Sequence, residues 1–256
     1  MEDPVYTLPF LKEVIEARRK DIIGVATAEG DRLKIGKKKS KLLYLFSLLF
    51  IMGIPYFLKY SVTTIGFKIR SAMANIGIGK SPSILSFADE LNIPTFKLKS
   101  PNSKEFLMHL KELKPDIVIH QSQNIVKKEL LSIPRIGTLN RHNALLPKNR
   151  GRLTPFWVLF KGEKETGVSI HFVEEGLDSG PIVVQEKFAV PRGATFNTIV
   201  KKNYTIAPKA MLKAIELLEN GFSDFLPNPD EEASYNSVPN IQDAIRFRIG
   251  HRLKGN

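Results

Sequence analysis

Residues 139–151 read LNRHNALLPKNRG, and residues 177–180 read LDSG. If residues 138–142 form a strand, its two-residue period places the Asn140 and His142 side chains on the same face, just before a loop closed by proline. Asp178, in the second stretch, can add a carboxylate to that pair. The sequence therefore predicts a site that combines an amide, an imidazole and a carboxylate.

These three groups suit acyl transfer to an amine. An asparagine amide can donate a hydrogen bond to a carbonyl oxygen under attack, and losing such a donor typically costs about 2.7 to 4 kcal/mol of transition-state stabilisation. An imidazole beside it can donate to the same oxygen or move a proton. A neighbouring carboxylate favours the charged imidazole and can accept, directly or through water, the proton that the attacking amine loses.

Four motifs in one order carry a family resemblance. They are the Asn-x-His that ends at His142, the Leu-Leu-Pro that follows it, the Thr-Gly-Val of residues 166–168 and the Leu-Asp-x-Gly of residues 177–180. Over residues 114–221 the chain resembles the folate-dependent formyltransferases. That family includes methionyl-tRNA formyltransferase, glycinamide ribonucleotide formyltransferase and the sugar N-formyltransferases.

The resemblance implies roles for particular residues. Asn140, His142 and Asp178 would be the catalytic trio, and 10-formyltetrahydrofolate would be the formyl donor, which places the protein in one-carbon metabolism. The folate contacts that it implies are Ser122, Gln123, Asn124, Ile125, Val126, Leu177 and Asp178. The segment HQSQNIV at residues 120–126 is more polar than is usual in the family.

The loop after the motif strand is the expected place for the acceptor. Lys148 and Arg150 could hold an acceptor phosphate there, with Gly151 beside them, although cations on a loop are often simply solvated. One position departs from the family pattern, since Ala144 stands where a serine often precedes Leu-Leu-Pro. That change bears on loop geometry or acceptor contacts more than on the chemistry.

Composition indicates a globular protein with a basic surface. The chain has 256 residues, of which 43% are hydrophobic and 25% charged, as in ordinary globular domains. It contains no cysteine, which excludes disulfides, thiolate metal sites and thiol nucleophiles and fits a cytoplasmic protein. A net charge of +12 favours an anionic partner such as a nucleic acid, a lipid headgroup, a nucleotide sugar or a polyglutamylated folate.

Hydrophobic periodicity predicts an α/β fold with a mostly parallel central sheet, Rossmann-like as in the resembled family. The expected helices cover residues 8–20, 103–113, 127–131, 155–161 and 195–219, the last kinked or split near Pro208. The expected strands cover residues 21–27, 115–119, 138–142, 168–173 and 182–190. In such a sheet, ligands bind beyond the carboxyl ends of the strands, where Asn140 and His142 lie.

The expected organisation is a catalytic domain at residues 1–221, with an insertion at 31–80, followed by a C-terminal tail at 222–256. The family normally opens with a hydrophobic strand before a loop like EDPVYTLPF, and here that loop follows Met1 directly. The first strand is thus expected to be missing from this sequence, and we expect the natural start to lie upstream.

The insertion combines a basic segment with an apolar run. KIGKKKSK at residues 34–41 precedes LLYLFSLLFIMGIPYFL at residues 42–58, which has no charge. Gly53 and Pro55 should break a spanning helix. Two interpretations stay open: residues 34–60 bind an anionic membrane surface through Lys37, Lys38, Lys39 and Lys41, or the run folds into a helical subdomain or dimer surface.

Three functions follow from these observations. The first is formyl transfer from 10-formyltetrahydrofolate to a primary amine, either a small molecule or a carrier-linked group such as an amino sugar on a nucleotide or lipid. The second keeps the chemistry with methionyl-tRNA as acceptor, and the third is a non-catalytic adaptor for a membrane or RNA. The expected location is cytoplasmic, with a peripheral site at the inner membrane face as one interpretation, and no histidine spacing predicts a metal site.

Overall fold

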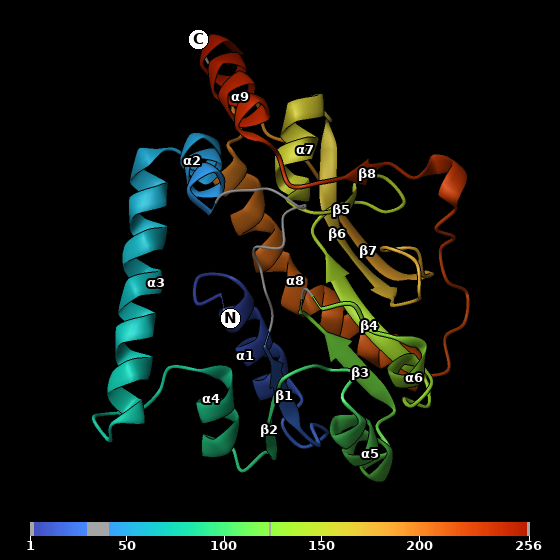
Figure 1. Ribbon diagram of the computed structural model, residues 1–256. Coiled ribbons are helices and arrows are strands. Elements are labelled where there is room, and N and C mark those ends of the chain that lie inside the picture. The colour runs from blue at the N-terminus through green and yellow to red at the C-terminus, as the bar shows by residue number, and fades with distance from the viewer. Residues whose placement is uncertain (1–2, 30–40, 123, 255–256) are drawn as a thin grey trace. The chain divides into compact units, whose positions relative to one another are not determined.

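The computed structural model describes residues 3–29, 41–122 and 124–254 (Figure 1). The chain forms two compact units: the first unit comprises Met1–Asp31 and Tyr60–Asn140, and the second unit comprises Arg32–Lys59 and Arg141–Asn256. Gln123 and the three lysines at 37–39, to which the sequence assigned roles, lie outside the described residues.

The first unit alternates helices with short parallel strands. Its elements are α1 (Thr7–Ala17), β1 (Val25–Ala28), the part of α3 (Ile54–Asn75) that begins at Tyr60, α4 (Ile84–Glu90), β2 (Thr95–Leu98), α5 (Lys104–Leu113), β3 (Ile117–His120), α6 (Lys128–Leu131) and most of β4 (Gly137–His142). β1 pairs with β2 in parallel, with Val25 opposite Thr95. β3 pairs with β4 in parallel, and His120 lies opposite Asn140 at the carboxyl ends of both strands.

The second unit is built on an antiparallel hairpin and a long helix. It contains α2 (Lys41–Met52), β5 (Arg150–Gly151), α7 (Thr154–Lys161), β6 (Glu165–Phe172), β7 (Ile182–Ala189), α8 (Phe196–Glu219), η1 (Asp230–Glu232), β8 (Tyr235–Asn236) and α9 (Ile241–Lys254). β6 and β7 pair in antiparallel fashion, and α8 packs along both (Figure 1). Ile170 and Met211 are completely buried in the core of this unit.

α8 is one continuous helix, so of the two expected outcomes at Pro208, a kink or a split, the split does not occur. Proline removes one backbone donor and usually disrupts a helix interior, but here Pro208 is buried with Ala207 and Ala210 on the face that packs against the sheet. The helix begins with a reciprocal capping box between Thr195 and Thr198. Core burial over the length of α8 therefore outweighs the local cost of the proline.

The apolar insertion forms two helices that break at Gly53, as its glycine and proline predict. Gly53 has a φ of +81°, and no helix among the described residues is long and apolar enough to span a bilayer. α2 packs on α8 and α9, where Arg248 Nε donates to the Phe50 carbonyl at 2.7 Å and Asn197 Nδ2 donates to the Met52 carbonyl at 2.8 Å. Both side chains satisfy carbonyls that a helix leaves free at its C-terminus.

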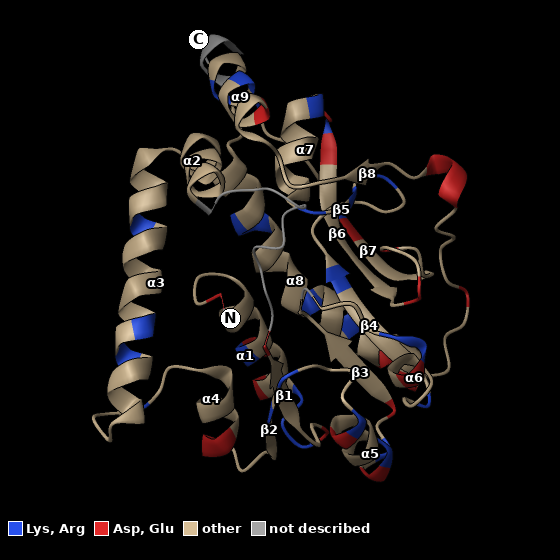
Figure 2. Ribbon diagram, in the orientation of Figure 1, with Lys and Arg blue, Asp and Glu red and all other residues tan. Residues whose placement is uncertain are grey.

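α2 also has an apolar face that the second unit does not cover. Leu42, Leu43, Leu45 and Phe46 are exposed, whereas Ser47 and Ile51 are buried. Figure 2 shows a ribbon without charged residues along this part of α2. Part of the insertion thus packs against α8 and α9, and part of its apolar surface is exposed.

Candidate active site

The strand β4 carries two of the three predicted catalytic residues. Asn140 is the last residue of the first unit and His142 follows two positions later in the second. In the first unit, Gln121 Nε2 donates to Asn140 Oδ1 at 2.9 Å and to the His120 carbonyl at 2.8 Å. This hydrogen bond fixes Oδ1 as the end of the Asn140 amide that faces Gln121.

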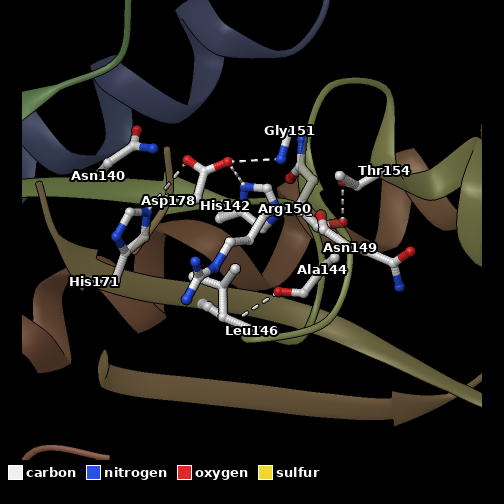
Figure 3. A network of polar contacts seen from close by, with 12 residues as sticks. Asn140, His142, Ala144, Leu146, Asn149, Arg150, Gly151, Thr154, His171 and Asp178 are labelled. Atoms are coloured by element: carbon white, nitrogen blue, oxygen red, sulfur yellow. Dashed lines mark hydrogen bonds and ion pairs between the residues drawn. The ribbon is translucent and has the colours of Figure 1, made fainter. Parts of the chain in front are cut away.

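His142 is buried, and both of its ring nitrogens face protein atoms (Figure 3). Nε2 lies 2.8 Å from the backbone oxygen of Asn149, and Nδ1 lies 3.5 Å from Asp178 Oδ2. A carbonyl only accepts hydrogen bonds, so Nε2 carries a proton. Nδ1 is therefore the nitrogen that can gain or give a proton beside the carboxylate.

Asp178 lies at the tip of the β6–β7 loop in a left-handed conformation, with a φ of 50°. Its Oδ2 accepts the backbone N–H of Gly151 at 2.8 Å, as well as facing His142 (Figure 3). Gly151 has a φ of +100°, and a Cβ there would lie 2.2 Å from the Asn236 carbonyl oxygen. This position consequently requires glycine, and its N–H fixes one carboxylate oxygen.

His171 is a further neighbour of Asp178, which the sequence motifs did not identify. It is completely buried on β6, its Nε2 lies 3.8 Å from Asp178 Oδ1, and its ring meets that of His142 edge-on with centroids 6.3 Å apart. Burial, reinforced by His142, lowers its pKa from 6.5 to about 4 despite Asp178 and the Phe172 carbonyl, which both raise it. His171 is therefore neutral at physiological pH. The sequence did contain a signal for His171: it follows Ser169 by two residues, which gives both the same face of a strand that leads to Asp178.

The Leu-Leu-Pro loop is held by the β6–β7 hairpin. Ser169 Oγ donates to the Ala144 carbonyl at 2.8 Å and accepts the Leu146 N–H at 3.1 Å, while Gln185 Nε2 donates to the Leu146 carbonyl at 2.9 Å. Ala144 itself is completely buried, which favours loop geometry over acceptor contact as the role of this departure from the family pattern.

The Arg150 guanidinium is bonded to the C-terminal part of the chain. Its side chain is fully buried, with Nη1 bonded to Asp230 Oδ1 at 2.5 Å and to the Tyr235 hydroxyl at 2.8 Å. Nη2 donates to the backbone and side-chain oxygens of Asn228 at 2.8 and 3.0 Å. The structure thus corrects the expectation for Arg150, because contacts within the chain use its guanidinium. Lys148, by contrast, is exposed.

The segment expected to contact folate has both buried and open side chains. Val126 is buried with Phe106, Leu110 and Leu130, whereas Ile125 is largely exposed. The backbone of this segment is held in the first unit, where His120 Nε2 lies 3.1 Å from the Asn124 carbonyl and Asn102 Nδ2 donates to the Ile125 carbonyl at 2.8 Å.

The other expected folate residues have open surroundings. Ser122 Oγ accepts the Asn124 N–H at 3.1 Å, and Leu177 is exposed in the second unit. Burial lowers the pKa of His120 next to this segment. Within the described ranges, no group of three histidine or carboxylate side chains is arranged to hold a metal ion.

Comparison with known proteins gives a consistent result. Residues 72–215 match the formyl transferase family model. A methionyl-tRNA formyltransferase from Kosmotoga olearia is 36% identical over 169 residues, which cover 65% of this chain and 54% of that protein. One from Syntrophus aciditrophicus is 30% identical over 226 residues, 82% of this chain and 72% of that protein.

Solved structures share the fold. The N-formyltransferase from Helicobacter canadensis, in complex with folinic acid and dTDP-3-aminofucose, superposes with a TM-score of 0.52 at 24% identity, covering 65% of this chain and 64% of that one. HypX from Aquifex aeolicus, in complex with tetrahydrofolic acid, gives a TM-score of 0.50 at 20% identity, covering 64% of this chain and 30% of that one.

The match has a defined extent. The chain spans about half the length of the first curated relatives, at 54%, 53% and 47%. The family model nevertheless covers more than half of this chain and contains the Asn-x-His strand, the Leu-Leu-Pro loop and Asp178. On these grounds the chain belongs to the formyl transferase family.

Proposed function

We propose that this protein transfers a formyl group from 10-formyltetrahydrofolate to a primary amine. The observation that carries the proposal is the buried pair of His142 and Asp178, with Nδ1 and Oδ2 3.5 Å apart at the end of β4. Family membership supports the reaction type. Two proteins of the same fold were solved with folinic acid or tetrahydrofolic acid, which supports a folate donor.

In the proposed reaction, the amine nitrogen attacks the formyl carbon, and the carbonyl electrons move to the formyl oxygen. Asn140 Nδ2 donates to that oxygen, since the two-residue period of β4 gives it the same face as His142. Asp178 accepts a proton from the amine, directly or through water. The carbonyl then re-forms, the bond from carbon to N10 breaks and N10 takes up a proton, which leaves a formamide and tetrahydrofolate.

The pair of His142 and Asp178 suits these proton transfers. Nε2 of His142 is committed to the Asn149 carbonyl, so the ring cannot rotate freely and Nδ1 stays toward the carboxylate. A proton on Nδ1 can donate to the developing oxyanion or balance the charge of Asp178. Gly151 keeps Oδ2 in place by its N–H, which leaves Oδ1 of Asp178 less constrained.

We further propose that the folate contacts are residues 122–126, Leu177 and Asp178. The support is the resemblance noted from the sequence and the open side chains of Ile125 and Leu177. Val126 would contribute through its backbone, because its side chain is buried in the first unit. Gln123 belongs to this proposal by sequence position.

The acceptor that we propose is an amino sugar on a nucleotide or lipid carrier. A structure of the same fold was solved with dTDP-3-aminofucose, and exposed Lys148 next to the catalytic loop could meet a carrier phosphate. Methionyl-tRNA is the second candidate, favoured by the names of the sequence relatives. An RNA acceptor predicts binding that weakens steeply with salt, because each neutralised phosphate releases counterions.

The proposed location is the cytoplasm, with α2 meeting an anionic membrane surface if the acceptor is lipid-linked. The exposed apolar face of α2, defined by Leu42, Leu43, Leu45 and Phe46, supports this placement. Sedimentation with vesicles of phosphatidylglycerol, compared with neutral vesicles, tests it. Replacing Leu42 and Leu43 by serine should abolish sedimentation while leaving the folded state intact, and an unchanged result would contradict the membrane contact.

The decisive experiment measures formylation of a dTDP-linked amino sugar and of methionyl-tRNA by mass spectrometry, with 10-formyltetrahydrofolate as donor. Asp178→Asn should lower kcat by about 10²- to 10⁴-fold, the usual loss for a proton-transfer group. Glu174→Gln, at a position of the same loop outside the trio, is the matched control and should retain activity. If folded protein neither binds 5-formyltetrahydrofolate in calorimetry nor formylates either acceptor, the proposal fails and the adaptor function takes its place.

A further inference from the structure

Residues 226–237, here named the C-terminal strap, run along two loops of the candidate active site. β8 pairs in parallel with β5, so Tyr235 lies opposite Arg150 and Asn236 opposite Gly151. At its other end, Leu226 forms an antiparallel bridge with Ile182, at the start of β7. The strap therefore touches both the loop before Gly151 and the loop that carries Asp178.

Asn228 is the residue of the strap that joins these loops directly. Its Nδ2 donates to the Asp178 carbonyl at 2.8 Å and to the Gly180 carbonyl at 2.9 Å, while its Oδ1 accepts from Arg150 Nη2 at 3.0 Å. The two acceptors on one side and the guanidinium donor on the other define the orientation of the amide. Both hydrogens and the oxygen of this amide are thus used on the site.

These contacts form a closed series, here called the ring, that includes Asp178, Asn228, Arg150 and Gly151. Arg150 is bonded through the chain to Gly151, whose N–H donates to Asp178 Oδ2 at 2.8 Å. The backbone of Asp178 is bound in turn by Asn228, which binds Arg150. The carboxylate oxygen and the backbone of Asp178 are therefore both linked to the Arg150–Gly151 segment.

The backbone of this loop has a conformation that needs support. Asp178 adopts a left-handed φ of 50°, which is unfavourable for a residue other than glycine, and its neighbour Leu177 is 59% exposed. The guanidinium of Arg150, which is buried, binds the Asn228 side chain that contacts this loop. The loop is therefore held from the strap side through the two hydrogens of the Asn228 amide.

We propose that Asn228 is a positioning residue for Asp178 in formyl transfer. This inference rests on the proposed function of the His142 and Asp178 pair. Asn228 acts through the backbone of Asp178 and Gly180 and sets where the carboxylate lies between Gly151 and His142. Misplacement of a catalytic group by about 1 Å can lower a rate about 100-fold.

Asn228→Asp provides the sharpest test. The variant keeps the shape and an oxygen toward Arg150, but it places a carboxylate oxygen against the two carbonyls that Asn228 Nδ2 now binds, so the loop should move away. Asp230→Asn is the matched control, because Asp230 also binds Arg150, is 77% exposed and does not touch the Asp178 loop in any described contact. Asn228→Ser is the second variant, for use if the aspartate does not fold.

The first readout is the amide resonance of Gly151 in the unliganded protein, because that N–H donates to the Asp178 carboxylate. Loss of this contact should move the amide proton upfield in Asn228→Asp and Asn228→Ser, and Asp230→Asn should retain the wild-type resonance. The second readout is kinetic: kcat should fall by about 10- to 100-fold, while KM for the amine should stay near the wild-type value.

Each outcome decides the inference. An upfield Gly151 resonance together with a lower kcat in the Asn228 variants, and not in Asp230→Asn, supports it. A wild-type resonance in folded Asn228→Asp or Asn228→Ser overturns it, whatever happens to the rate. If the wild-type protein has no formyl transfer activity but the resonance moves as expected, the positioning contact stands and the proposed function fails.

Discussion

The backbone oxygen of Asn149 lies 2.8 Å from Nε2 of His142 and thereby determines which ring nitrogen faces Asp178. Asn149 is almost completely buried, with a φ of 58°. Its side chain donates to Glu163 Oε1 at 2.8 Å and accepts from Lys161 Nζ at 2.9 Å and from Asn236 Nδ2 at 3.0 Å. A carbonyl held in this way gives the imidazole one defined tautomer.

Replacing Asn149 by glycine tests this arrangement, since glycine tolerates the same φ but removes the side-chain contacts. We expect a loss of about 3 kcal/mol in the free energy of unfolding, because hydrogen bonds to charged groups contribute about 1.5 to 3 kcal/mol each. Urea unfolding followed by circular dichroism measures it. Asn92→Gly, at an exposed residue with the same φ of 58°, is the control and should stay within about 0.5 kcal/mol.

Gln121→Glu should reverse the orientation of the Asn140 amide. Gln121 Nε2 now donates to Asn140 Oδ1 at 2.9 Å, and a carboxylate cannot donate. Asn140 would then turn its Nδ2 toward the introduced carboxylate and its oxygen toward the reacting carbonyl. Steady-state kinetics should show kcat lowered by about 10²- to 10³-fold, comparable to Asn140→Ala, because both variants lose the oxyanion donor. A wild-type kcat in Gln121→Glu would rule out this orienting role.

Gly151→Ala should be strongly destabilising for a steric reason. The added Cβ would lie 2.2 Å from the Asn236 carbonyl oxygen, in addition to a φ of +100°. Gly162→Ala separates the two effects, since Gly162 has a φ of +71° but open space around its Cβ. We expect about 1 kcal/mol for Gly162→Ala and at least about 3 kcal/mol for Gly151→Ala in urea unfolding. Equal losses in the free energy of unfolding would mean that β8 shifts away from β5 and makes room for the methyl group.

Stability should depend on pH through His171. Its pKa of about 4 in the folded protein is below its ordinary value of 6.5, so the unfolded chain binds the proton more readily between these values. The neutral His171 therefore contributes to the free energy of unfolding. This contribution is complete above about pH 6.5 and is lost as the pH falls toward 4, and it amounts to at most roughly 3 kcal/mol. In His171→Gln this part of the pH dependence should disappear.

The measurement compares urea unfolding at pH 4.5 and pH 7. His109→Gln, at a half-exposed position, should retain the wild-type difference between the two pH values. If His171→Gln retains it as well, the buried imidazole is not its source.

Much of the fold is predictable where one periodicity dominates. The helices at residues 103–113 and 195–219 and the strands at 138–142 and 182–190 agree with the structure to within a few residues, because each has a clear apolar period and a cap or turn residue. β2 at Thr95–Leu98 was missed, since four residues with one lysine give no clear pattern. The sequence left open whether the helix at Pro208 is kinked or split, and burial along α8 accompanies a helix that is not split there.

The candidate site likewise has one part that the sequence predicts and another that it does not. Short motifs identify His142 and Asp178, which the structure brings together in the second unit. The sequence offered Arg150 as a phosphate ligand because it is a cation on the loop after the motif strand. Its partners Asn228, Asp230 and Tyr235 are about 80 residues away in sequence, so no local pattern indicated them. Contacts at such separations have no local signature, and the same is true of the strap, which the sequence presented only as part of a C-terminal tail.

The contacts of the C-terminal strap also have a consequence for biosynthesis. Asn228, Ser234 and Asn236 bind the loops of His142 and Asp178, so these contacts can form only after the ribosome has translated residue 236. A nascent chain that already contains both residues would still lack the hydrogen bonds from Asn228 to the Asp178 loop. Emergence of the strap from the exit tunnel therefore sets the earliest time at which the site can be complete.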